Sequence, residues 1–133
     1  MTNTAYVQSS SPAYATDITV GAHHLLADEP ADAGGSDSGP APKELLLSAL
    51  GACTAITLRM YAERKQWPLE QVQVQLSFGD AGSSKDRTVI EREIKLTGAL
   101  DEEQRQRLLQ IANACPLHKI LTGAVEIPTK LAG

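Results

Sequence analysis

The sequence predicts an α+β fold, in which helices are segregated from an antiparallel sheet. Three stretches indicate this class. Residues 41–67 read as one long helix, residues 69–78 alternate strictly between apolar and polar side chains, and residues 101–114 carry the start signals of another helix. The length suits one domain, and we expect it to cover residues 1–133.

The long helix has chemically marked ends. Pro42 fits the first helical turn, where a missing N–H costs nothing, and Pro68 cannot continue the helix. Between Leu45 and Met60 the side chains are apolar almost all round. A helix of this kind must be buried on every side.

A membrane span is the competing interpretation of this helix. The apolar run is shorter than the roughly 20 residues that a span needs, and Lys43, Glu44 and Arg59 bracket it closely. We therefore expect the core of a soluble protein and no membrane partner. Because one sheet covers only part of the helix, we expect a second subunit to cover the rest, which predicts an obligate homodimer.

Three short β-forming segments precede the helix. They lie at residues 6–9, 14–20 and 22–27, and the last two read as a hairpin around Gly21. Alternation places His23 and His24 on opposite faces, so one of them points inward. That histidine is either a hydrogen-bonded structural residue or a functional one.

Residues 28–40 form a loop by composition, since they are rich in Gly, Asp, Ser and Pro. Neither a nucleotide-binding fingerprint nor the spacing of a calcium loop is present.

A second hairpin follows the long helix. Residues 69–78 read as a half-buried strand, and residues 88–98 form its partner. In the partner strand, Arg92 shares a face with aliphatic side chains at Ile90 and Ile94. It is either a snorkelling edge residue or a buried cation with a purpose.

The C-terminal part predicts a helix, a short helix and a strand. Asp101 is the expected N-cap of the first helix, Gln104 completes a near capping box, and Arg105 falls on the wet face. A short helix is expected over residues 116–121, and residues 124–131 are expected to close the sheet as a final strand.

The charge balance excludes some partners. There are 16 acidic and 12 basic residues, which gives a formal net charge of −4, and the basic residues are scattered. This is not the footprint of a nucleic-acid binder. The first ten residues, MTNTAYVQSS, resemble no secretory signal. We expect a cytoplasmic protein, in which two cysteines are more often redox-active or metal-binding than a structural disulfide.

The two cysteines lie in different environments. Cys53 is in the middle of the long helix among apolar side chains, which raises a thiol pKa, so a reactive Cys53 needs a cation from elsewhere. The alternative is a buried small hydrophobic residue. Cys115 precedes Pro116 at a helix start, where N–H groups favour a thiolate. A metal site with His118 is not expected, since paired C-x-x-C spacing is absent.

Two runs of sequence surround the cysteines, GGSDSGPAPKELLLSALGACTAITLRMYAERK and NACPLHKIL. Together they resemble the OsmC/Ohr family, the osmotically inducible and organic-hydroperoxide-resistance proteins, and in particular its small OsmC-like redox proteins. The resemblance implies an intertwined homodimer with two central helices between sheets and active sites at the subunit interface.

The resemblance also implies a reaction. Cys53 corresponds to the peroxidatic nucleophile, which forms a sulfenic acid on attacking an organic hydroperoxide, and Cys115 corresponds to the residue that resolves it to a disulfide. A dithiol reductant, a lipoylated protein in some relatives, restores the thiols. No metal and no cofactor are expected.

The sequence departs from the family pattern at two places. Peroxidase members use an arginine from the N-terminal hairpin, but no arginine precedes Arg59 here. His23, His24 and Arg92 are candidates to replace it. The family's glutamate near the start of the long helix aligns with Lys43, beside Glu44, which faces away from Cys53 on an ideal helix. The second hypothesis is therefore a non-peroxidase member that binds a small apolar or electrophilic molecule at the dimer interface.

Overall fold

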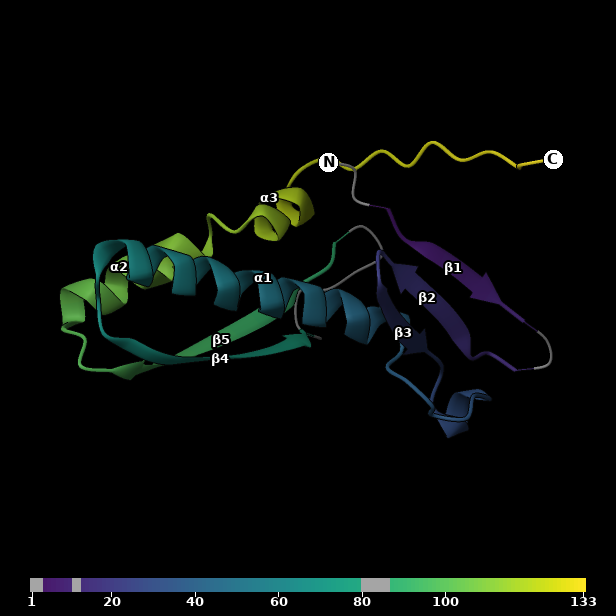
Figure 1. Ribbon diagram of the computed structural model, residues 1–133, viewed down its shortest axis with the longest axis horizontal. Coiled ribbons are helices and arrows are strands. Elements are labelled where there is room, and N and C mark those ends of the chain that lie inside the picture. The colour runs from purple at the N-terminus through teal and green to yellow at the C-terminus, as the bar shows by residue number, and fades with distance from the viewer. Residues whose placement is uncertain (1–3, 11–12, 80–86) are drawn as a thin grey trace. The chain divides into compact units, whose positions relative to one another are not determined.

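The chain folds as two compact units that share the long helix. The computed structural model describes residues 4–10, 13–79 and 87–133. The N-terminal unit is Met1–Leu46 and the C-terminal unit is Leu47–Gly133, and α1 (Pro42–Lys65) begins in the first and continues in the second. Figure 1 shows the order of the elements along the chain.

The N-terminal unit contains an antiparallel sheet of three described strands in the order β1-β2-β3, which are Tyr6–Ser9, Thr16–Val20 and His23–Ala27. The predicted hairpin between the last two strands is confirmed, with Val20 opposite His23. The expectation that one histidine points inward is wrong. Both His23 and His24 are exposed, as are the next two residues of β3, because the described strands of this sheet bury only Ala27 of β3.

The loop after β3 is confirmed and is organised by Asp28. Asp28 is buried, with 2% of the residue exposed. Its carboxylate accepts hydrogen bonds from the N–H groups of Glu29, Ser36 and Ser38 and from the Ser38 hydroxyl. Glycine is required at position 39, because a Cβ there would collide with the carbonyl oxygen of Leu26.

The C-terminal unit places helices on an antiparallel hairpin. Its further elements are β4 (Leu69–Phe78), β5 (Ile90–Gly98), α2 (Glu102–Ala112) and α3 (Pro116–Thr122). The strict alternation in β4 is confirmed, since its glutamines are exposed and its apolar residues from Val72 to Phe78 are half-buried.

The helices α1 and α2 cover one face of the β4-β5 hairpin (Figure 1). The core between them is built on Leu58, Leu108 and Ala112, none of which is exposed. The predicted capping box of α2 is present, because Asp101 accepts from the N–H of Gln104 and the Gln104 side chain accepts in return. These contacts confirm the α+β class.

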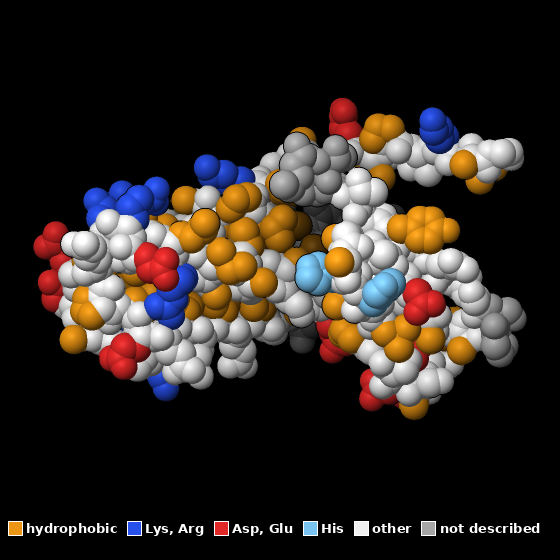
Figure 2. Space-filling model, in the orientation of Figure 1, with side chains coloured by type: hydrophobic (Ala, Val, Ile, Leu, Met, Phe, Trp, Pro, Cys, Tyr) orange, Lys and Arg blue, Asp and Glu red, His pale blue; other side chains and the backbone are white. Residues whose placement is uncertain are grey.

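The long helix is buried on one side only within this chain. Its buried side chains recur every four residues and are Leu50, Thr54, Leu58 and Ala62. By contrast, Ile56 is 57% exposed and Met60 is 63% exposed. Figure 2 shows hydrophobic side chains gathered over this helix in the C-terminal unit. Burial on every side is therefore not achieved by the described residues of one chain.

Among the described residues, α1 is a helix with the length and hydropathy to cross a membrane, with a mean hydropathy of 1.5 over its most apolar window. A single helix of this kind is weak evidence for a span, because the core helices of soluble proteins have the same composition.

Three expectations about the sheet and the C-terminal part need correction. The described strands form two antiparallel sheets, not one. Residues 124–131 form no strand, and Ile127 is 80% exposed, because none of the described strands pairs with this segment. Arg105 is half-buried and not on a wet face, since its guanidinium donates to the carbonyl oxygens of Leu96, Gly98 and Leu100.

Candidate active site

The two cysteines are presented by different helices of the C-terminal unit. Cys53 lies one position before the buried Thr54 in α1. Cys115 is the N-cap of α3 and has extended backbone angles, φ −60° and ψ 135°, as expected before a proline. The Cys115 sulfur accepts a hydrogen bond from the N–H of His118, at 3.4 Å, which satisfies a donor of the first turn.

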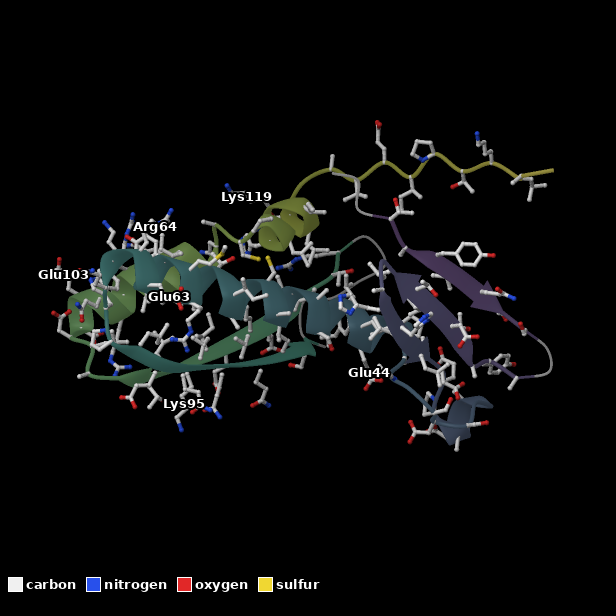
Figure 3. All side chains as sticks on the ribbon, viewed as in Figure 1. Glu44, Glu63, Arg64, Lys95, Glu103 and Lys119 are labelled. Carbon is white, nitrogen blue, oxygen red and sulfur yellow. The ribbon has the colours of Figure 1, made fainter. Side chains whose placement is uncertain are left out.

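The fold brings the two sulfur atoms together. Both cysteines are free thiols, and Cys115 Sγ donates to Cys53 Sγ across 2.8 Å although 62 residues separate them in sequence. Figure 3 shows sulfur atoms between α1 and the start of α3. A disulfide therefore requires only a small approach of one sulfur to the other.

The two thiols differ in accessibility. Cys53 is partly exposed, whereas Cys115 is fully buried with an exposed fraction of 0%. An electrophile from solvent can therefore reach Cys53 before it reaches Cys115.

The surroundings also separate the two pKa values. Burial opposes ionisation of Cys53, but hydrogen bonds from the Cys115 thiol, the Leu117 N–H and the Thr57 hydroxyl, with the positive charge of Arg92, outweigh it and lower the pKa of Cys53. Burial, together with the adjacent Cys53 sulfur, raises the pKa of Cys115. Of the two thiols, Cys53 is therefore the one that ionises more readily.

This distribution reverses the expectation from sequence. We predicted that the helix start at Pro116 would favour the thiolate of Cys115. Instead, burial and the neighbouring sulfur raise the pKa of Cys115 by more than the helix start lowers it. The Leu117 N–H of the same helix start donates to Cys53 and lowers the pKa of that thiol.

Arg92 lies next to the cysteine pair as a half-buried cation. It extends from β5 and donates to Thr54 Oγ1 on α1 at 3.0 Å and to Asn113 Oδ1, just after α2, at 2.8 Å. Its Nη2 also lies 3.3 Å from His118 Nδ1 on α3. Arg92 is therefore not a free edge side chain, because its guanidinium is held by hydrogen bonds to side chains of other segments.

His118 is a neutral histidine in this arrangement. Burial first, and then the charge of Arg92, lower the pKa of His118. Because arginine has no acceptor, the close contact makes His118 Nδ1 the acceptor and leaves the ring proton on Nε2.

A cavity of about 530 Å³ adjoins the same arginine and histidine. Arg87, Arg92 and His118 are its basic side chains. Its aliphatic lining residues are Leu50, Val89, Ile90, Ile94, Leu109 and Leu121.

The other predicted site residues lie in the N-terminal unit. Glu44 Oε1 accepts from the N–H of Ala41 at the start of α1, where Figure 3 labels it. His24 Nδ1 lies 3.3 Å from the Thr19 hydroxyl, and His23 is on the neighbouring position of β3. Among the described residues, no group of three or more His, Cys, Asp and Glu side chains is arranged to hold a metal ion.

Sequence reasoning missed two polar residues of the site. Thr54 is fully buried and Asn113 binds the Arg92 guanidinium, and neither was a candidate. The available signal was a threonine on the face that α1 buries and an asparagine two residues before Cys115. His118 was considered only as a metal ligand.

The fold and this site define an α+β thiol protein whose paired cysteines come from a long central helix and from the start of a short one. The chain belongs to the OsmC-like protein family, whose model matches residues 35–130. No curated protein sequence matches the chain significantly.

Solved structures share this fold over most of their length. An OsmC-like protein from Mycoplasma pneumoniae has a TM-score of 0.78 and 16% identity, with 92% of this chain and 89% of that chain covered. An organic hydroperoxide resistance protein OsmC from Legionella pneumophila has a TM-score of 0.67 and 19% identity, with 92% and 90% covered. An organic hydroperoxide resistance protein from Elizabethkingia anophelis has a TM-score of 0.66 and 19% identity, with 95% and 91% covered.

Proposed function

We propose that the protein is a thiol-dependent peroxidase that reduces organic hydroperoxides. The observation that carries this proposal is the pair of free thiols whose sulfurs lie 2.8 Å apart, one partly exposed and one buried. The names of two structural relatives, which are organic hydroperoxide resistance proteins, support the substrate class.

The proposed reaction begins at Cys53. Its thiolate attacks the terminal oxygen of the hydroperoxide, the O–O bond breaks, and the alkoxide leaves and takes up a proton to become the alcohol. Cys53 is oxidised to a sulfenic acid. Cys115 then attacks the Cys53 sulfur, the S–S bond forms, and the sulfenic hydroxyl leaves as water with the proton of the Cys115 thiol.

A dithiol closes the proposed cycle. It reduces the Cys53–Cys115 disulfide by thiol–disulfide exchange and is itself oxidised to a disulfide. A lipoylated protein is the reductant that the family resemblance favours. The proposed cycle needs no metal and no cofactor. The cytoplasmic location of the protein remains a prediction.

The test follows the intact mass of reduced protein treated with cumene hydroperoxide. The wild type is expected to lose two hydrogens as the disulfide forms. Cys115→Ser, which has no resolving thiol, is expected to gain one oxygen instead, and Cys53→Ser is expected not to change. A wild type whose mass stays unchanged after prolonged incubation contradicts the proposal.

We also propose that the protein works as a homodimer of single 1–133 domains. Support comes from the exposed apolar side of α1, where Ile56 and Met60 are more than half exposed in one chain. A second copy that covered this side would remove apolar surface from water, which stabilises association.

The second candidate function is binding of a small ligand without peroxide chemistry. The cavity beside Arg92 and His118 favours it, because aliphatic walls with basic side chains suit a molecule that has an apolar body and an acidic group. Saturable binding of such a molecule, together with an unchanged protein mass under hydroperoxide, would select this candidate over the peroxidase.

A further inference from the structure

One guanidinium connects three separate segments of the C-terminal unit. Arg92 Nη1 donates to Thr54 Oγ1 at 3.0 Å and to the carbonyl oxygen of Ala112 at 3.5 Å. Its Nη2 donates to Asn113 Oδ1 at 2.8 Å and lies 3.3 Å from His118 Nδ1. The side chain therefore extends from β5 to α1, to the end of α2 and to α3.

These partners flank both cysteines. Thr54 is the residue after Cys53 in α1, and its hydroxyl is held in turn by the carbonyl oxygen of Leu50 at 2.7 Å. Asn113 lies two residues before Cys115 and His118 lies three residues after it. The segment that carries Cys115 is thus tied to Arg92 on both sides.

We propose that Arg92 is a positioning residue for both thiols: its hydrogen bonds hold the segment of Cys115 against α1, and its fixed charge favours the thiolate of Cys53. This inference rests on the proposed peroxidase function for the resolving step, but the thiolate part stands without it.

The groups around Cys53 determine how its thiolate is stabilised. Burial raises the pKa of Cys53, whereas hydrogen bonds from the Cys115 thiol, the Leu117 N–H and the Thr57 hydroxyl lower it, and the Arg92 charge lowers it further by a smaller amount. Of these, Arg92 carries the fixed positive charge, since a guanidinium stays protonated at every relevant pH. His118, the other basic group of the cluster, is held neutral by burial and by Arg92.

The shape of the guanidinium determines how many partners it can hold. Its planar fork places several N–H donors in fixed directions, so one side chain can bind a hydroxyl, an amide and a carbonyl oxygen at once. A lysine at position 92 would keep the charge but lose the fork. The two contributions can therefore be separated by substitution.

The first experiment measures the thiolate without any peroxide. In a Cys115→Ser background, alkylation of Cys53 by iodoacetamide is followed by mass spectrometry as a function of pH. Adding Arg92→Met is expected to move the midpoint to higher pH and slow alkylation at pH 7 several-fold. Adding Arg92→Lys is expected to leave the midpoint near that of the background.

The second experiment measures the resolving step in chains that retain both cysteines. With one equivalent of cumene hydroperoxide, the wild type is expected to pass directly to the disulfide. Arg92→Lys and Arg92→Met are expected to accumulate the species with one added oxygen, because the Cys115 segment is no longer held in place. Thermal unfolding verifies that each variant is folded.

Arg59 provides the matched control for a merely structural arginine. It also joins α1 to the hairpin, by donating to the carbonyl oxygens of Leu69 and Glu70 on β4. Arg59→Met is expected to lower thermal stability but to change neither the alkylation midpoint nor the rate at which the disulfide forms. An Arg92→Met midpoint equal to that of the background, or an equal shift from Arg59→Met, overturns the role of the charge.

The remaining outcomes separate this inference from the proposed function. If Arg92→Met fails to fold, Arg92→Lys tests the positioning role alone. Disulfide formation in Arg92→Lys at the wild-type rate overturns that role. A wild type that does not react with hydroperoxide removes the peroxidase function, while a shifted alkylation midpoint would still support the thiolate part.

Discussion

Cys53 and Cys115 contact each other and yet respond oppositely to their surroundings. The same sulfur–sulfur hydrogen bond lowers the pKa of the acceptor, Cys53, and raises that of the donor, Cys115. Partial exposure of Cys53 adds a route for an electrophile that Cys115 lacks. In the proposed reaction, this asymmetry assigns the attack to Cys53 and the resolving step to Cys115.

Asp28 provides a stability prediction at the same scale. Hydrogen bonds from the Ser38 hydroxyl and from the N–H groups of Glu29 and Ser38 lower the pKa of Asp28 from 3.8 to about 2. Because the folded pKa is the lower one, the carboxylate stabilises the fold above the unfolded value of 3.8, and this contribution is lost as the pH falls through about 2.

Asp28→Asn removes this charge and gives its donors a weaker acceptor. Amide hydrogen exchange at Ser36 and Ser38 is expected to accelerate at pH 6, and the difference in stability from the wild type is expected to shrink as the pH falls toward 2. The control is Asp32→Asn, which changes an exposed carboxylate of the same loop. Unchanged exchange in Asp28→Asn would contradict the role given to this residue.

The side chains that α1 buries, four residues apart, determine how much its packing contributes to the free energy of unfolding. Leu58 is fully buried against Leu108 and Ala112. Leu58→Ala is expected to lower the free energy of unfolding by about 2–5 kcal/mol, since it removes buried methyl groups and leaves a cavity. Urea unfolding followed by circular dichroism measures the change.

Leu109→Ala is the matched control for this prediction, because it removes the same atoms from a side chain that is 53% exposed. A loss of less than about 1 kcal/mol is expected there. Equal losses in the two variants would show that α1 and α2 do not pack as described.

At the scale of the whole molecule, the exposed side of α1 predicts the oligomeric state. Light scattering at micromolar concentration is expected to give twice the chain mass of 14.2 kDa. The double substitution of Ile56 and Met60 by Glu is expected to give the monomer mass, because each charge would be buried without a partner in an apolar interface. The exposed Glu103→Gln, on α2, serves as the control and should remain dimeric. A wild-type monomer would contradict the homodimer.

Local sequence signals were sufficient for most elements. The prolines at 42 and 68, the alternation in β4 and the capping box at Asp101 act between near neighbours, and each predicted its element to within a few residues. The segment 124–131 is the exception, because a strand needs a partner edge and the residues of the segment itself do not specify one.

The sequence by itself therefore determined the α+β class, the long helix and the identity of the two cysteines as candidates. Only the tertiary structure decided which thiol ionises more readily, that Arg92 lies beside the pair, and that Thr54 and Asn113 bind Arg92. The physical reason is distance along the chain. Burial, charge and hydrogen bonding at Cys53 come from β5 and α3, which approach α1 only when the hairpin and helices pack.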